Sequence, residues 1–151
     1  MAMKAGKWGV TVRKVRISDA SRIAKLSGEL GYPSTAAKVV KRLHALKPTA
    51  HHAVFVAETK TGGVVGWLHV SISRLLELDV RAEVNGLIVS ESQRSRGAGA
   101  QLLAAAEAWA KQQRCEAVNL RSNVIRERAH KFYLRQGYEH YKTQKAFQKA
   151  I

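Results

Sequence analysis

The sequence predicts a single domain of the α/β (α+β) class, in which a mixed, mostly antiparallel sheet carries helices on both faces. A length of 151 residues is enough to bury one sizeable core. Apolar residues recur with the period of strands in some segments and of helices in others, in the order β-α-α-β-β-β-α-β-α-β. Neither a repeat nor a linker interrupts this order, so we expect one domain over residues 1–151.

The N-terminal half shows the signals of a strand, two helices and a hairpin. A strand has apolar residues at every second position, whereas a helix has them at every third or fourth position behind a polar N-cap residue. The expected elements are a loose leader (residues 1–8), a strand (10–17), a helix after Ser18-Asp19, a helix after Ser34 or Thr35, and two strands (53–58 and 64–73) joined by a turn at 60–63.

The C-terminal half alternates strands with helices. Gly137 is expected to end the last helix, since glycine readily adopts the left-handed conformation at which many helices stop. The expected elements are a strand ending at Val89, a helix at about 98–113, a strand at 116–121, a helix through Ile125, Ala129 and Phe132, and a closing strand at 138–149.

Composition argues against several classes of protein. The sequence has no apolar run of membrane-spanning length and no pattern of a signal peptide, so we expect a cytoplasmic protein without a membrane partner. Cys115, the only cysteine, is expected to pack as a small apolar residue. His51 and His52 have no further ligand at suitable spacing, so we expect solvated loop histidines and no metal.

The formal net charge of +15 is unusually high. A strongly basic protein attracts polyanions, so association with nucleic acid is one interpretation and a solvated cationic surface is the other. The charge is dispersed along the chain, and no basic motif is interleaved with aromatic residues. We therefore favour the cationic surface and expect no nucleic-acid partner.

The segment Gln93–Ala100, which reads Q-R-S-R-G-A-G-A, has the features of a diphosphate-binding turn. It follows the strand-like run Val84–Val89 and leads into a helix, where free amides and the helix dipole favour anions. Its glycines allow close approach of a ligand, and its arginines can each hold a phosphate. A Walker A loop is excluded because no Lys-Ser or Lys-Thr follows, and Leu102 replaces the third glycine of a dinucleotide fingerprint.

Three motifs in this order resemble the GNAT superfamily of acyl-CoA-dependent N-acyltransferases. The first is Arg94-Ser95-Arg96-Gly97-Ala98-Gly99, which matches the family pattern of Gln or Arg, two residues, Gly, one residue, then Gly or Ala. The others are Leu87-Ile88-Val89 and Ala129-His130-Lys131-Phe132-Tyr133, followed by Gly137-Tyr138. The resemblance covers nearly the whole chain. It implies a GNAT-like sheet of six to seven strands that splays between its two central strands.

The resemblance also implies a site for acetyl-CoA, whose diphosphate and pantetheine arm would contact the loop and the strand before it. A bulge that exposes this strand is expected at Gly86. Many family members have an asparagine where this chain has Arg126, so Asn123 either replaces that contact or caps the helix. The expected donor-binding residues are Leu87, Ile88, Val89, Arg94, Ser95, Arg96, Gly97, Ala98, Gly99, Ala100, Asn123 and Arg126.

The reaction implied is direct attack of an amine on the thioester. An alkyl ammonium, with a pKa of about 10.4, must first lose a proton. Glu83 is the candidate base because it is the only acid in the strand before the loop, although a solvated strand-end carboxylate is an equal interpretation. Tyr133 matches the family's general acid and would protonate the departing thiolate.

The acceptor stays open at this point. Small amines, aminoglycosides, polyamines and peptide N-termini are all compatible, although the positive charge disfavours a polycation. Tyr32, Trp67, His69 and Tyr141 are candidates to line the acceptor cleft or are ordinary packing. We expect a homodimeric N-acetyltransferase; the alternatives are an acyl-CoA-binding module without catalysis and a basic protein that associates with nucleic acid.

Overall fold

A computed structural model describes residues 6, 9–46, 50–61 and 63–151. The predicted leader therefore lies outside the described residues except for Gly6. The chain forms two compact units, Met1–Arg121 and Ser122–Ile151, which are described separately below. None of the helices in the described ranges is long and apolar enough to cross a membrane.

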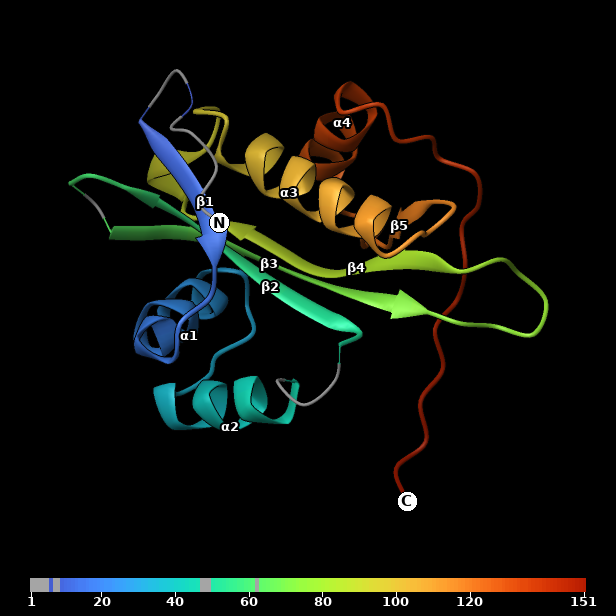
Figure 1. Cartoon of the computed structure of the whole chain (residues 1–151), viewed down its shortest axis with the longest axis horizontal. Helices are drawn as coiled ribbons and strands as arrows, with labels where there is room; N and C mark the ends of the chain where they lie inside the picture. Colours follow the sequence, from blue (N-terminus) through green and yellow to red (C-terminus); the bar gives the residue numbers. More distant parts are fainter. Residues whose placement is uncertain (1–5, 7–8, 47–49, 62) are drawn as a thin grey trace. The chain divides into compact units, whose positions relative to one another are not determined.

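The first unit is built on one five-stranded sheet in the order β1-β2-β3-β4-β5 (Figure 1). The first four strands are antiparallel neighbours, and β5 pairs with β4 in parallel. The mixed, mostly antiparallel sheet predicted from the sequence is thus confirmed. The strands are β1 (Val10–Lys14), β2 (His52–Thr59), β3 (Gly63–Ser73), β4 (Arg81–Val89) and β5 (Val118–Leu120).

Helices cover both faces of this sheet (Figure 1). Neighbouring residues of a strand point to opposite faces, and β3 shows this clearly. Trp67 packs with the core under α1 and α2, whereas a Cβ on Gly66 would lie 3.3 Å from Leu102 of α3. The helices are α1 (Ala20–Glu29) and α2 (Ala36–Leu46) on one face and α3 (Ala98–Gln112) on the other.

The start of α1 differs from the prediction. The first strand ends at Lys14, and a short 3-10 helix, η1 (Ile17–Asp19), follows. Asp19 does not cap α1 through its side chain; its carboxylate instead accepts two hydrogen bonds from Arg13, at 2.9 and 3.0 Å, and one from the backbone N–H of Arg16 at 2.7 Å. The carboxylate thereby ties the end of β1 to the start of α1. The predicted cap of α2 is confirmed, since Thr35 Oγ1 accepts from Lys38 N at 3.2 Å.

The second unit contains α4 (Glu127–Arg135), and the predicted stop at Gly137 is confirmed by its φ of +87°. The closing strand predicted at 138–149 is wrong, because residues 138–151 have no regular secondary structure. A strand persists only where a neighbour satisfies its backbone hydrogen bonds and buries one of its faces. Phe147 illustrates the failure of both conditions, with 90% of its surface exposed. The sheet consequently has five strands rather than six to seven.

Candidate functional site

The turn before α3 has the geometry of an anion-binding site. A 3-10 helix, η2 (Glu91–Gln93), leads into two left-handed residues, Ser95 with φ +65° and Gly97 with φ +82°. Gly97 occupies the N-cap position of α3, so glycine meets no steric penalty there. The first N–H groups of α3 have no acceptor within the helix, and the helix dipole adds positive potential at this end.

The two arginines of this turn are held differently. Arg94 donates from Nε to the carbonyl of Val89 at 3.4 Å and lies 3.7 Å from a carboxylate oxygen of Glu91. Arg96 is exposed, and within the described ranges it has no hydrogen bond or ion pair. Arg96 is therefore free to meet an anion, whereas Arg94 must first exchange a weak ion pair.

Strand β4 leaves one edge open next to this turn. Strand β5 pairs only with Ala82–Val84, so among the described residues no strand covers the same edge of β4 from Asn85 to Val89. A bulge begins the open stretch: Val84 pairs with Val70 and Gly86 with His69, so Asn85 has no Cα partner in the register, although its Nδ2 donates to Ser71 Oγ of β3 at 2.8 Å. The bulge predicted at Gly86 thus lies one residue earlier.

The residues predicted to bind the pantetheine arm lie along this open edge. Leu87, Ile88 and Val89 pair with β3 on their other side. Ile88 is buried in the core under α1, while Leu87 and Val89 are half-buried. The segment is therefore both a core strand and a strand with one edge available for pairing.

Glu83 lies on the α1/α2 face of the sheet. It pairs with Ser71 of β3, and alternation along β3 puts Ser71 on the same face as Trp67 and His69. The Glu83 carboxylate is 3.1 Å from Nε of Arg121, at the end of β5. Because the Glu83 side chain is only 19% exposed and Arg121 is 81% exposed, the arginine can move away and leave the carboxylate in place.

A cavity of about 130 Å³ lies between this face and the helices α1 and α2. Aliphatic side chains form most of its walls, and its polar lining comes from Ser27, Arg42, Trp67 and His69. The sequence-based candidates Trp67 and His69 are thus brought together. Tyr32, in contrast, is 71% exposed and does not line the cavity.

His69 is held neutral by its surroundings. Burial, and secondarily the nearby His52, lowers the pKa of His69 to about 4. His52 Nδ1 lies 3.0 Å from His69 Nε2, and the rings stack at 5.2 Å between centroids. The prediction of a loop position for His52 is wrong, because it begins β2. Within the described part of the chain, no group of three or more His, Cys, Asp or Glu residues could hold a metal.

The His52–His69 pair was missed, because a register shift in the β2–β3 hairpin hides it from a count of residues along the sequence. Register across the β2–β3 hairpin pairs Val54 with His69, so His52 is the diagonal neighbour of His69 on the same face. Counting from the turn at 60–63 would have paired Ala53 with His69 and placed the two rings on opposite faces, because the register shifts between Ala57 and Glu58. The ion pair between Glu83 and Arg121 also had no local signal, because it depends on the crossover to β5.

In the second unit, Tyr133 is a protonated phenol among aromatic rings. Its ring centroid lies 5.4 Å from that of Phe132 and 6.2 Å from that of Tyr138. Burial raises the pKa of Tyr133, and Arg126 opposes this shift. At neutral pH the side chain therefore carries a proton that it can donate.

The turn before α4 uses Asn123 and Arg126 structurally. Asn123 Oδ1 accepts from Ile125 N at 3.2 Å, and its carbonyl lies 2.9 Å from His130 Nε2. Arg126 is the N-cap residue of α4. Asn123 therefore does not cap α4, since its side chain shapes the turn ahead of the helix, and its contact with the donor stays a prediction.

Comparison with known proteins decides the family. A sequence model of the Acetyltransferase (GNAT) family matches residues 22–138. The chain belongs to this family. The resemblance inferred from the sequence is confirmed, and the chain is an acyl-CoA-dependent N-acyltransferase.

The chain is also similar to individual N-acetyltransferases. The chain is 35% identical over 104 residues to the aminoalkylphosphonate N-acetyltransferase of Salmonella typhimurium; this match spans 67% of the chain and 66% of that protein. A structure of AAC(6')-Iy with the bisubstrate analog CoA-S-monomethyl-acetylneamine superposes with a TM-score of 0.81 at 19% identity, covering 94% of this chain and 99% of the other. Glucosamine-6-phosphate N-acetyltransferase from Arabidopsis thaliana gives 0.79 at 20% identity, covering 92% and 97%. The two structures support the GNAT fold, and the family uses acetyl-CoA.

Proposed function

We propose that this GNAT enzyme transfers an acetyl group from acetyl-CoA to the primary amine of a small molecule by direct attack. The observation that carries the proposal is the open edge of β4 from Asn85 to Val89, which is followed by the left-handed turn at Gly97. A strand edge followed by a helix N-terminus suits a ligand with a peptide-like arm and a diphosphate.

Each part of the donor would meet a different part of the first unit. The backbone of Leu87–Val89 would hold the pantetheine arm, and a free amide there would polarise the thioester carbonyl. The turn residues Arg94, Ser95, Arg96, Gly97, Ala98, Gly99 and Ala100 would hold the diphosphate. Asn123 and Arg126 belong to the second unit, and their contact with the donor remains part of the proposal.

Proton transfer would use two side chains. Glu83 would accept the ammonium proton, directly or through a water molecule, from the cavity face of the sheet. Its carboxylate lies 3.1 Å from Nε of the exposed Arg121, and the ammonium of the acceptor would take the place of that guanidinium. Tyr133 would donate its proton to the thiolate, which the raised pKa of the phenol allows at neutral pH.

The names of the relatives support a small amine as the acceptor. One is named for aminoalkylphosphonates and another for glucosamine 6-phosphate, both of which are primary amines. The alternative is a GNAT-like module that binds acyl-CoA without turnover.

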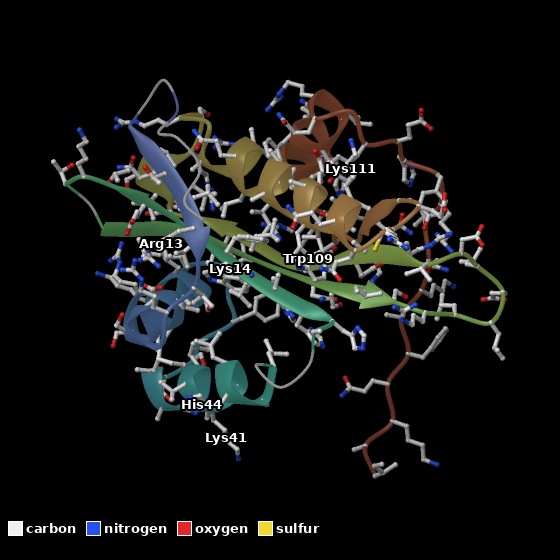
Figure 2. The ribbon with its side chains drawn as sticks, in the orientation of Figure 1. Arg13, Lys14, Lys41, His44, Trp109 and Lys111 are labelled. Carbon is white, nitrogen blue, oxygen red and sulfur yellow. The ribbon has the colours of Figure 1, made fainter. Side chains whose placement is uncertain are left out.

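A thiol-release assay with acetyl-CoA over a panel of primary amines tests the proposal. We expect turnover with at least one small amine and roughly 100-fold slower turnover for Glu83→Gln at unchanged acetyl-CoA affinity. Lys111→Gln, on the far helix α3, changes the net charge by one unit in the opposite sense and serves as the control for a change of surface charge (Figure 2). Tight acetyl-CoA binding with no turnover on any amine would favour the binding module instead.

A further inference from the structure

The sheet face covered by α1 and α2 changes from apolar to polar along the β3–β4 hairpin. The three register pairs that show this change are Trp67 with Ile88, His69 with Gly86, and Ser71 with Glu83. Ile88 is buried in the core, whereas the side chain of Glu83 is 19% exposed. The polar part of this face therefore begins at the bulge, beside the strand edge that would hold the thioester.

The bulge adds Asn85 to this polar part. Two residues of the bulged strand, Asn85 and Gly86, stand opposite a single residue of β3, His69. Gly86 has no side chain, so Asn85 is the member of the pair that can contact a ligand through its side chain. Its Nδ2 donates to Ser71 Oγ at 2.8 Å, and this bond holds the Asn85 side chain on the face that carries Glu83. Bulges beside active sites commonly direct a side chain in this way.

The bond to Ser71 leaves the other end of the Asn85 amide available. Because Nδ2 faces the serine, Oδ1 points away from it. In the part of the chain that the structure describes, this oxygen accepts no hydrogen bond, and Asn85 is exposed. An amide oxygen has two lone pairs for N–H donors. Asn85 thus offers an oriented acceptor to a donor that comes from outside the protein.

The charges around Asn85 suit one ammonium group. Glu83 supplies a single carboxylate, which lies 3.1 Å from Nε of Arg121. Arg81 precedes Glu83 by two residues on the same face of β4, and its Nε is directed at the carbonyl of Asp79 at 3.5 Å. One negative charge between two positive charges attracts one ammonium and leaves no carboxylate for a second.

A single nitrogen can contact Glu83 and Asn85 together. Alternate residues of a strand lie ~6.8 Å apart along its axis and stand on one face. Since an N–H···O bond is ~2.9 Å long, one nitrogen bridges two oxygens that are roughly 5 Å apart. The flexible side chain of Glu83 closes the difference. The two residues therefore form a pair of acceptors for one ammonium, next to the open edge of β4.

We propose that Oδ1 of Asn85 binds the amine that is acetylated and that Asn85 restricts the acceptor to amines with one ammonium group. The inference rests on the proposed function, because it concerns the acceptor of the same reaction. The ammonium would donate one N–H to Glu83 and one to Asn85. When its proton passes to the Glu83 carboxylate, the neutral amine keeps the bond to Asn85, and the lone pair left on nitrogen attacks the thioester carbon. Asn85 thus orients the amine, while Ser71 positions Asn85.

Steady-state kinetics with the full-length enzyme and acetyl-CoA tests the role of the amide oxygen. We expect Asn85→Ala to raise KM for propylamine roughly tenfold or more, because a hydrogen bond to a charged group is lost, and to change acetyl-CoA affinity less than about twofold. Ser71→Ala should raise the same KM by a smaller factor and add nothing to Asn85→Ala, since Ser71 acts through Asn85. Ser73→Ala is the matched control, because it removes a hydroxyl from the same face of β3, opposite Arg81.

A purely structural role for Asn85 predicts a different pattern. If the amide only fastened the bulge, Asn85→Ala and Ser71→Ala would cause equal losses, because each breaks the same bond. The losses would then appear in acetyl-CoA affinity, with KM for propylamine unchanged. That result would overturn the inference.

A charge change at the same position tests the restriction to one ammonium. We expect the wild type to prefer propylamine to 1,3-diaminopropane roughly tenfold or more in kcat/KM. Asn85→Asp adds a second carboxylate at nearly the same shape, so the relative use of the diamine should rise at least about threefold. An unchanged ratio in Asn85→Asp would contradict the specificity assigned to this residue.

A binding measurement separates this inference from the proposed function. Propylamine is titrated calorimetrically into the enzyme in the presence of CoA, which has no acetyl group to transfer. Binding that Asn85→Ala weakens and Ser73→Ala preserves supports the amine site even if Glu83→Gln keeps full activity, a result that would remove only the base role of Glu83. Absence of propylamine binding to the wild-type complex would refute the amine site, and turnover of other amines would still leave acetyl transfer intact.

Discussion

The ring of Trp67 lies directly against the backbone of Gly86, so closely that a methyl group at Gly86 would stand 2.9 Å from two of the ring carbons. This contact joins the core under α1 and α2 to the bulged part of β4. It also explains why a glycine follows the bulge: its negative φ would suit other residues, but the space above it is taken by the indole.

Replacing Gly86 by alanine should therefore displace Trp67. We expect a loss of about 1–3 kcal/mol in the free energy of unfolding, together with a raised KM for the acceptor, because overpacking shifts both the ring and the strand. Urea unfolding and steady-state kinetics measure the two effects. Gly28→Ala is the control: it lies in α1 with nothing within 4 Å of the added methyl group, and it should stabilise by up to ~1 kcal/mol. Equal stability of the Gly86 and Gly28 variants would contradict the contact.

Asp19→Asn should weaken the junction between β1 and α1. Asp19 is only 8% exposed at its side chain and receives two hydrogen bonds from Arg13, whose guanidinium keeps the Glu58 contact when Asp19 is neutralised. We expect a loss of about 2–3 kcal/mol in the free energy of unfolding, at the lower end of what a broken buried ion pair costs. Thermal unfolding at pH 7 is the measurement. Asp19→Glu keeps the negative charge that pairs with Arg13 and should therefore lose less stability than Asp19→Asn.

The ion pair between Asp19 and Arg13 also makes the free energy of unfolding depend on pH. Hydrogen bonds from Arg13 and from the backbone of Arg16 lower the pKa of Asp19 below its usual value, against the opposing effect of burial. The unfolded state then binds the proton first as pH falls. The stabilisation is complete above the unfolded pKa of about 3.9 and is lost as pH falls through the folded pKa. Asp19→Asn should lack this loss below about pH 4.

His69 should make folding less favourable in weak acid. Its folded pKa of about 4 lies below the ordinary histidine value of 6.5, so the unfolded state binds a proton that the folded state excludes. Stability is complete above about pH 6.5 and declines as pH falls towards the folded pKa. We expect a decline of ~1–2 kcal/mol after solvent screening. Urea unfolding from pH 7 to pH 4.5 should show this decline for the wild type and a flatter profile for His69→Gln; identical slopes would show that His69 does not titrate differently in the two states.

Tyr133→Phe tests the general acid. Removal of the hydroxyl should lower kcat by about 10²-fold or more with little change in acetyl-CoA affinity, since proton donation matters only in the chemical step. Tyr138→Phe, whose ring packs edge-on to Tyr133, is the matched control and should keep most of the activity. An unchanged kcat in Tyr133→Phe would assign the phenol a packing role with Phe132.

Most helices, strands and turns could be predicted from the sequence, because the residues that determine them lie within a few positions of one another. The N-cap at Thr35, the left-handed Gly97 and Gly137, and the alternation along β2 and β3 all act over a few residues. The closing strand at 138–149 failed for the opposite reason: alternation there had no neighbouring strand to pair with. The bulge was placed at Gly86 rather than Asn85, because glycine signals a close approach as well as a bulge, and here it signals the approach of Trp67.

The candidate site was predictable where it consists of backbone and a local motif. The loop at residues 94–100 and the strand before it were located from glycines, arginines and apolar runs. Contacts between distant residues were not predictable: the ion pair of Glu83 with Arg121 depends on the crossover to β5, and the bond from Asn85 to Ser71 depends on the register of β4 against β3.

The open edge of β4 has a consequence for the enzyme in concentrated solution. An uncovered strand edge is a template on which another polypeptide can add a strand, and proteins commonly guard such edges with charge. Here the open stretch ends at Val89, and the turn that follows carries Arg94 and Arg96. These two cations would repel a second copy of this basic chain while attracting a diphosphate. The same residues that we propose to bind the donor would thus protect the empty enzyme from aggregation.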